Sequence, residues 1–169
     1  MIGDVFANIF RFALLVFLQF FLLNNIQFSG FVNPYLYVLF VLWLPFATPG
    51  WLLLTASFIM GLVIDLASET VGYHTVATVF TGYLRIRLLK FIAPHDGYDP
   101  NMSPTIPSLG LSWFLKYVVI LVPAHHLVLF CVETFSFSDF LPAVLRALAS
   151  SIFTILFIFI YQFLSIRTK

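Results

Sequence analysis

The chain has 169 residues and a formal net charge of +1, and it is 62% hydrophobic but only 9% charged. Charged residues make up about a quarter of a typical globular chain, so this composition excludes an ordinary soluble domain. It predicts one integral membrane domain that covers residues 1–169. The near-neutral charge and the absence of a basic run give no indication of a nucleic-acid partner.

The first apolar stretch, 5–23, has the length of about 20 residues that a membrane-crossing helix needs. It has no basic residue before Arg11, and no small-residue cleavage site follows it. We therefore expect a retained first span and not a signal peptide. Near its end lie four polar residues, which either line an outer cavity or, as the simpler interpretation, hydrate the helix end: Gln19, Asn24, Asn25 and Gln27.

The second apolar stretch, 35–67, is interrupted by Pro45 and by the pair Pro49-Gly50. Proline removes a helical hydrogen bond, and Pro-Gly is a strong turn signal. The pattern predicts a hairpin of two helices, at 35–48 and 51–67. Because the first arm is short for a complete crossing, a re-entrant segment is the alternative, and both arrangements return the chain to the same side.

Three further apolar stretches follow, at about 71–92, 111–132 and 141–166, and the first is interrupted near its end by Arg85, Arg87 and Lys90. Between 92 and 110 the chain carries four prolines and two glycines. We expect an irregular cytoplasmic loop there. The predicted fold class is therefore all-α, a bundle of six transmembrane helices.

The basic residues predict the orientation of this bundle. In the six-span arrangement seven of them lie at or toward one face: Arg11, Arg85, Arg87, Lys90, Lys116, Arg167 and Lys169. Arg146 lies toward the other face, together with four acids: Asp65, Glu69, Glu133 and Asp139. Basic residues mark the cytoplasmic side of a membrane protein, so both termini are predicted to be cytoplasmic.

Two acids stand out in the stretch GLVIDLASETVGYHT, residues 61–75. We interpret Glu69 as a solvated turn residue, whereas Asp65 lies deeper, where a carboxylate is costly and faces a partner or a cavity. Gly61, one helical turn earlier, allows a neighbouring backbone to approach, and Gly72 permits a tight return. We expect the Asp65 carboxylate to accept hydrogen bonds from N–H groups at the start of the next helix, where the helix dipole favours an anion.

The sequence contains no GxSxG, HExxH, P-loop or CxxC motif, which are signatures of common enzyme classes. Adjacent helical residues such as His125 and His126 point about 100° apart, whereas zinc ligands on a helix favour a spacing of four. We expect these histidines to be hydrogen-bonded inside the bundle. No enzyme activity, catalytic residue, metal site or cofactor is predicted.

Small residues recur every four positions on two of the predicted helices, at Ala143, Ala147 and Ser151 and at Ser57 and Gly61. Such faces let helix backbones approach closely in lipid. They are either internal contacts of the bundle or faces for another membrane protein, including a second copy of this chain.

The segment GLVIDLASETVGYHTVATVFTGYLR, residues 61–85, resembles the signature of the rod-shape-determining MreD family. The matching positions are Gly61, Asp65, Gly72 and, more loosely, His74 and Gly82. The resemblance implies a non-enzymatic scaffold of the bacterial cell-wall elongation machinery, surrounded by the lipids of the cytoplasmic membrane. Its partners would be MreC, the glycan polymerase RodA and the transpeptidase of RodA.

The MreD family is also distantly similar in fold to the substrate-binding subunits of energy-coupling-factor vitamin transporters, and this is the alternative function. Many such subunits carry an AxxxA pattern on the first helix, whereas here Ala7 and Ala13 have a different spacing. The predicted external helix ends also lack a dense set of aromatic and polar residues for a polar vitamin. Both differences favour the scaffold.

Overall fold

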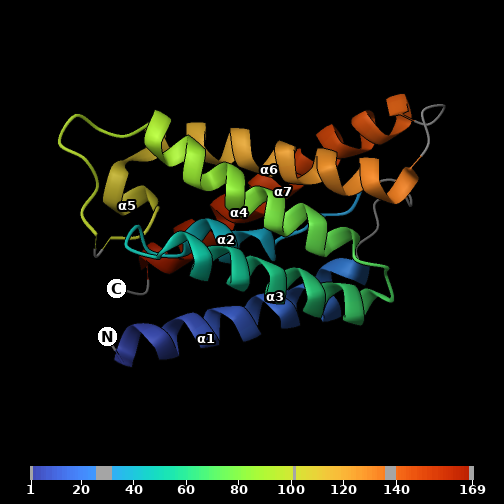
Figure 1. Cartoon of the computed structure of the whole chain (residues 1–169), viewed down its shortest axis with the longest axis horizontal. Coiled ribbons are helices and arrows are strands. Elements are labelled where there is room, and N and C mark those ends of the chain that lie inside the picture. Colours follow the sequence, from blue (N-terminus) through green and yellow to red (C-terminus); the bar gives the residue numbers. More distant parts are fainter. Residues whose placement is uncertain (1, 26–31, 101, 136–139, 168–169) are drawn as a thin grey trace.

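The computed structural model describes residues 2–25, 32–100, 102–135 and 140–167. The described residues are 79% helical and contain no strand, which confirms the all-α class. The long helices lie side by side along the longest axis of the molecule (Figure 1). Helix α1 begins and α7 ends at the end of the bundle where α5 lies, and the α3–α4 turn lies at the opposite end.

The first helical segment is α1 (Ile2–Phe17), continued by a π-helical turn, η1 (Leu18–Leu22), and a 3-10 turn, η2 (Leu23–Asn25). Gln19 lies in η1 and is only 1% exposed. Its Nε2 donates to Asn24 Oδ1 at 2.8 Å and to the Pro34 carbonyl at 3.1 Å. Hydration of the helix end is therefore the wrong interpretation of Gln19, because this side chain serves a buried backbone carbonyl. Gln27 lies outside the described residues.

The predicted helix at 35–48 is wrong in length, because α2 covers only Val38–Trp43. It ends there because Leu44 precedes Pro45 and adopts an extended ψ of 140°. Residues 34–44 are buried throughout and pass through the middle of the bundle (Figure 1). Extended residues cover about 3.3 Å each against 1.5 Å in a helix, so this short segment still connects the two ends of the molecule.

Helices α3 (Gly50–Ser68) and α4 (Tyr73–Phe91) lie close to their predicted positions. In the turn between them, Glu69 and Gly72 have positive φ values of 55° and 87°. Glu69 is exposed, as its interpretation as a solvated acid requires. The predicted irregular loop at 92–110 contains one short helix, α5 (Ile106–Leu109).

Helices α6 (Leu111–Thr134) and α7 (Phe140–Arg167) pack against each other near their predicted bounds. Ala143, Ala147 and Ser151 on α7 are 4%, 2% and 2% exposed, so this stripe of small residues faces the bundle's own interior. Near the α6–α7 connection, Arg146 donates to Glu133 Oε1 at 3.0 Å.

Four segments of the described chain are long and apolar enough to cross a membrane: Phe6–Asn25, Gly50–Ser68, Leu111–Thr134 and Phe140–Leu164. Helix α4 has a comparable length but carries Arg85, Arg87 and Lys90 in its last seven positions, and α2 is too short. The four apolar helices indicate a multi-pass membrane protein. Two of the six predicted spans, at 35–48 and 71–92, are not among these four.

Candidate functional site

The Asp65 carboxylate joins the end of α3 to the start of α4. It is 2% exposed and accepts four hydrogen bonds. Oδ1 accepts from Thr70 Oγ1 at 2.6 Å and from the His74 backbone N–H at 3.0 Å. Oδ2 accepts from the backbone N–H and the hydroxyl of Thr75, at 2.8 and 2.5 Å. The predicted bonds to N–H groups at the start of the next helix are therefore present, and they fix the register of the two helices.

Two glycines allow α3 and α4 to pack closely. A Cβ atom at Gly61 would lie 2.8 Å from the His74 carbonyl oxygen and closer still to atoms of Thr75 and Thr78. A Cβ atom at Gly82 would lie 2.6 Å from Ser57 Oγ. The small residues Ser57 and Gly61 are thus internal contacts of the bundle. Gly72 serves the same connection through its left-handed backbone, which glycine adopts at little cost.

A buried tyrosine connects this crossover to the centre of the bundle. The Tyr37 hydroxyl lies 2.8 Å from His74 Nδ1 and 2.9 Å from His125 Nε2. The other ring nitrogen of His125, Nδ1, lies 3.1 Å from Thr81 Oγ1. One hydroxyl group, on the residue just before α2, therefore links α4 to α6. His125 is hydrogen-bonded inside the bundle, as predicted.

His126 makes a separate connection, from α6 to α7. Its Nδ1 donates to the Val122 carbonyl at 2.8 Å, because a carbonyl oxygen only accepts. Its Nε2 is then the acceptor of the Thr154 hydroxyl at 3.1 Å, and Thr154 Oγ1 in turn accepts the Tyr35 backbone N–H at 2.9 Å. In the described part of the chain, no group of three or more His, Cys, Asp or Glu residues is arranged to hold a metal ion.

Polar side chains from the surrounding helices bond to six backbone groups of segment 33–44, in which residues 34–44 are buried. Lipid offers no hydrogen bonds, so non-helical backbone at membrane depth needs partners within the protein. Asn33, Tyr35 and Leu36 each donate a backbone N–H to a side-chain oxygen, and Pro34, Leu42 and Leu44 each accept at the carbonyl. The side chains involved are those of Gln19, Arg85, Tyr117, Ser150 and Thr154. Sequence reasoning missed this role, although polar residues within apolar spans were a usable signal.

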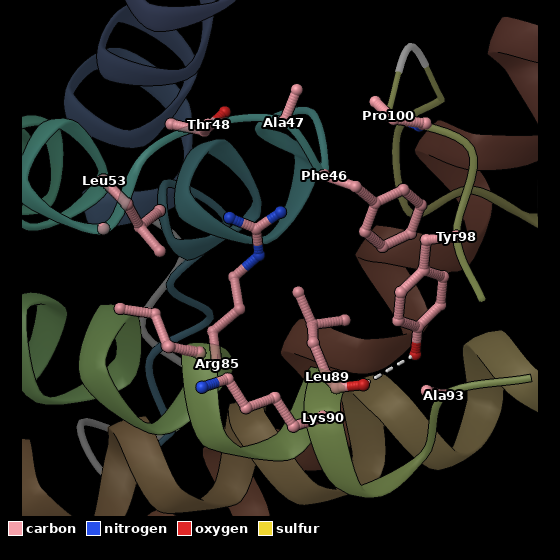
Figure 2. Close-up of a pocket in the computed structure, with 12 residues that line it drawn as sticks. Phe46, Ala47, Thr48, Leu53, Arg85, Leu89, Lys90, Ala93, Tyr98 and Pro100 are labelled. Atoms are coloured by element: carbon pink, nitrogen blue, oxygen red, sulfur yellow. Dashed lines mark hydrogen bonds between the residues drawn. The ribbon is translucent and has the colours of Figure 1, made fainter.

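A pocket of about 590 Å³ lies where the end of α4 meets the turn before α3 and the loop after α4 (Figure 2). Arg85 lines it but is only 1% exposed. Its Nε donates to Tyr117 Oη at 2.8 Å, and its guanidinium also donates to the Leu44 carbonyl. Tyr117 in turn donates to the Leu42 carbonyl at 2.9 Å. Arg85 and Tyr117 thus serve the end of α2, where carbonyls lack helical partners.

Aromatic residues form the opposite wall of this pocket. Tyr98 stacks on Phe46 with ring centroids 4.3 Å apart, and its hydroxyl donates to the Leu89 carbonyl at 3.0 Å (Figure 2). Burial raises the pKa of the Tyr98 phenol, so this hydroxyl stays protonated and remains a donor at neutral pH. The loop after α4 is thereby held against the end of the bundle.

The fold and this site together define an all-helical, multi-pass membrane protein with a hydrogen-bonded polar core. No protein-family model matches the chain, and neither a curated protein nor a solved structure matches it. The resemblance to the MreD family is a prediction from the sequence motif in residues 61–85, and these comparisons do not test it.

Proposed function

We propose that this protein is a non-enzymatic scaffold of the bacterial cell-wall elongation machinery, located in the cytoplasmic membrane. The observation that carries the proposal is the crossover at Asp65. The residues that resemble the MreD signature, Gly61, Asp65, Gly72 and His74, are used in contacts that hold α3 against α4. Such a motif keeps the shape of a bundle constant, which is what a scaffold requires of its own fold.

The filled centre of the bundle also favours the scaffold over a vitamin-binding subunit. A substrate-binding subunit needs room for its ligand between the helices. Here residues 34–44 occupy the middle of the bundle, and the Tyr37 hydroxyl is hydrogen-bonded to both His74 and His125. These polar groups are thus hydrogen-bonded within the chain and need no ligand as a partner.

In this proposal the partners MreC, RodA and its transpeptidase bind outward-facing helix surfaces. The small residues of α7 and α3 are buried in internal contacts, which leaves the exposed apolar side chains for lipids and partner helices. On α1 these include Phe6, Ile9 and Phe10, which are 69%, 59% and 67% exposed. The mechanism is helix-to-helix association in the plane of the membrane.

Co-purification from native membranes tests this function. Recovery of MreC together with RodA supports the scaffold, whereas recovery of an ATPase-coupled membrane subunit or a bound vitamin supports the transporter. If neither MreC nor RodA is enriched over a control membrane protein of similar abundance, the scaffold proposal fails.

Restoration of rod shape in a strain without its own MreD is the second test. We expect Asp65→Asn to restore rod shape better than Asp65→Leu, and equal, full activity of both would remove the proposed role of the motif.

We further propose that α4 and the segment 35–48 also cross the membrane and that both termini are cytoplasmic. Cysteine labelling in a Cys131→Ser background tests this topology at two exposed positions, His95 in the loop after α4 and Val71 in the α3–α4 turn. In intact cells an impermeant thiol reagent should label Val71→Cys, and it should reach His95→Cys only after permeabilisation. The reverse pattern would overturn the orientation.

A further inference from the structure

Arg85 places a positive charge inside the protein next to neutral partners. Its guanidinium bonds to the Tyr117 hydroxyl and the Leu44 carbonyl. Within the described residues, no carboxylate forms a salt bridge with it. A buried charge without an opposite charge is costly, so this position favours an anion in the space beside it.

The same guanidinium has donors left over, and they lie beside the pocket. An arginine carries five N–H donors, and its bonds to Tyr117 and Leu44 use only part of them. Figure 2 shows the Arg85 side chain extending into the pocket toward the turn with Ala47 and Thr48. Lys90 lines the same pocket and is exposed at its rim. Two cations, Arg85 and Lys90, and the hydroxyl-bearing residue Thr48 therefore line the same pocket.

The rest of the lining suits a molecule that is only partly polar. Leu53, Ile86 and Leu89 contribute apolar surface next to the two cations. The volume of about 590 Å³ exceeds the space of one phosphate group. A ligand with an anionic head and an attached carbon skeleton would use both kinds of lining.

We propose that this pocket binds an anionic phosphate ester, with Arg85 at its base and Lys90 at its rim. The planar guanidinium fork matches the oxygens of a phosphate group. Basic pockets between transmembrane helices bind phospholipid head groups, and a soluble phosphate ester offers the same chemistry. The inference is independent of the scaffold function, because it rests only on the charge and lining of the pocket.

Binding to the full-length, detergent-purified chain tests the proposal. The probes are phosphatidylglycerol, net-neutral phosphatidylcholine, glycerol 3-phosphate and inorganic phosphate, and the readouts are the thermal midpoint and bound lipid by native mass spectrometry. We expect phosphatidylglycerol to raise the midpoint of the wild type more than phosphatidylcholine does. An equal rise with glycerol 3-phosphate or inorganic phosphate would identify a soluble phosphate compound as the ligand, and no rise with either would identify the lipid.

Two pairs of variants separate this pocket from general attraction to anions. Lys90→Gln should weaken phosphatidylglycerol binding about fivefold, the effect of one basic residue near a charged surface. Its control, Arg87→Gln, removes an exposed charge from the same helix outside the pocket lining and should bind like the wild type. Ala93→Glu places a carboxylate at the exposed rim and should abolish binding, whereas Ala93→Gln should retain it. Wild-type binding by Lys90→Gln and Ala93→Glu, or equal effects of both lipids, would overturn the proposal.

Discussion

Thr75 donates its backbone N–H to Oδ2 of Asp65 at 2.8 Å, and its hydroxyl donates to the same oxygen. The acid near the end of α3 thereby binds the first turn of α4. Helix N-termini carry unpaired N–H groups and a positive dipole end, so an anion there is stabilised. The pair converts a loose turn between two helices into a fixed crossover.

Replacing Asp65 should therefore destabilise the protein in proportion to the acceptors lost. Asp65→Leu leaves the donors of Thr70, His74 and Thr75 without their partner and should cost on the order of 3 kcal/mol. Asp65→Asn keeps one side-chain oxygen and should cost less. Thermal unfolding in detergent measures both effects, with the exposed Glu69→Gln as the control in the same turn. A thermal midpoint of Asp65→Leu equal to that of the wild type would show that the hydrogen bonds of Asp65 do not stabilise the α3–α4 crossover.

Adding one methyl group at Gly61 should be more harmful than adding one at Gly82. At Gly61 the new Cβ meets backbone atoms of His74 and Thr75, which move only if α4 moves. At Gly82 it meets mainly the hydroxyl of Ser57, a side-chain atom that can shift without a movement of the α3 backbone. We expect Gly61→Ala to cost about 1–3 kcal/mol, as overpacking does, and Gly82→Ala to cost less. The reverse order of thermal midpoints would show that the α3–α4 spacing is not limiting.

The stripe on α7 should tolerate no enlargement, because it is buried in the bundle. Ala147 is 2% exposed, so Ala147→Leu should overpack the α7 contact and cost about 1–3 kcal/mol. Leu148→Ala is the control, since Leu148 is the next residue and is 53% exposed. Purification yield and thermal midpoint measure the difference. Normal stability of Ala147→Leu would mean that the stripe does not pack internally.

Thr154 should contribute to stability because its hydroxyl forms hydrogen bonds with two buried groups. Its hydroxyl accepts the Tyr35 N–H and donates to His126 Nε2. Thr154→Val keeps the shape, removes both bonds and should cost about 1–3 kcal/mol. The same change at the exposed Thr55, whose hydroxyl bonds to the Trp51 carbonyl, should have little effect. Faster hydrogen exchange at the Tyr35 amide would be the specific signature, and unchanged exchange would count against this role of Thr154.

The sequence by itself determined that this protein lies in lipid, that it is helical, and how the crossover between α3 and α4 is held. Scarcity of charge indicated lipid, and Pro45 and Pro49-Gly50 marked where helices break. The hydrogen bonds of Asp65 across the α3–α4 crossover were also predictable, because Asp65 and Thr75 are only ten residues apart and the intervening turn contains Gly72. Signals of this kind are local, and the backbone responds to them locally.

Only the tertiary structure decided the form of the central segment and the roles of the polar side chains that surround it. Tyr35 bonds to Thr154 across 119 residues, Leu36 to Gln19 across 17, and Leu44 to Arg85 across 41. A hydropathy pattern reports whether a residue prefers water or lipid, but it does not report which distant backbone group lacks a partner. In a membrane each such group must be paired within the protein, so the packing of the other helices allowed residues 34–37 to remain non-helical and reduced the predicted helix at 35–48 to α2.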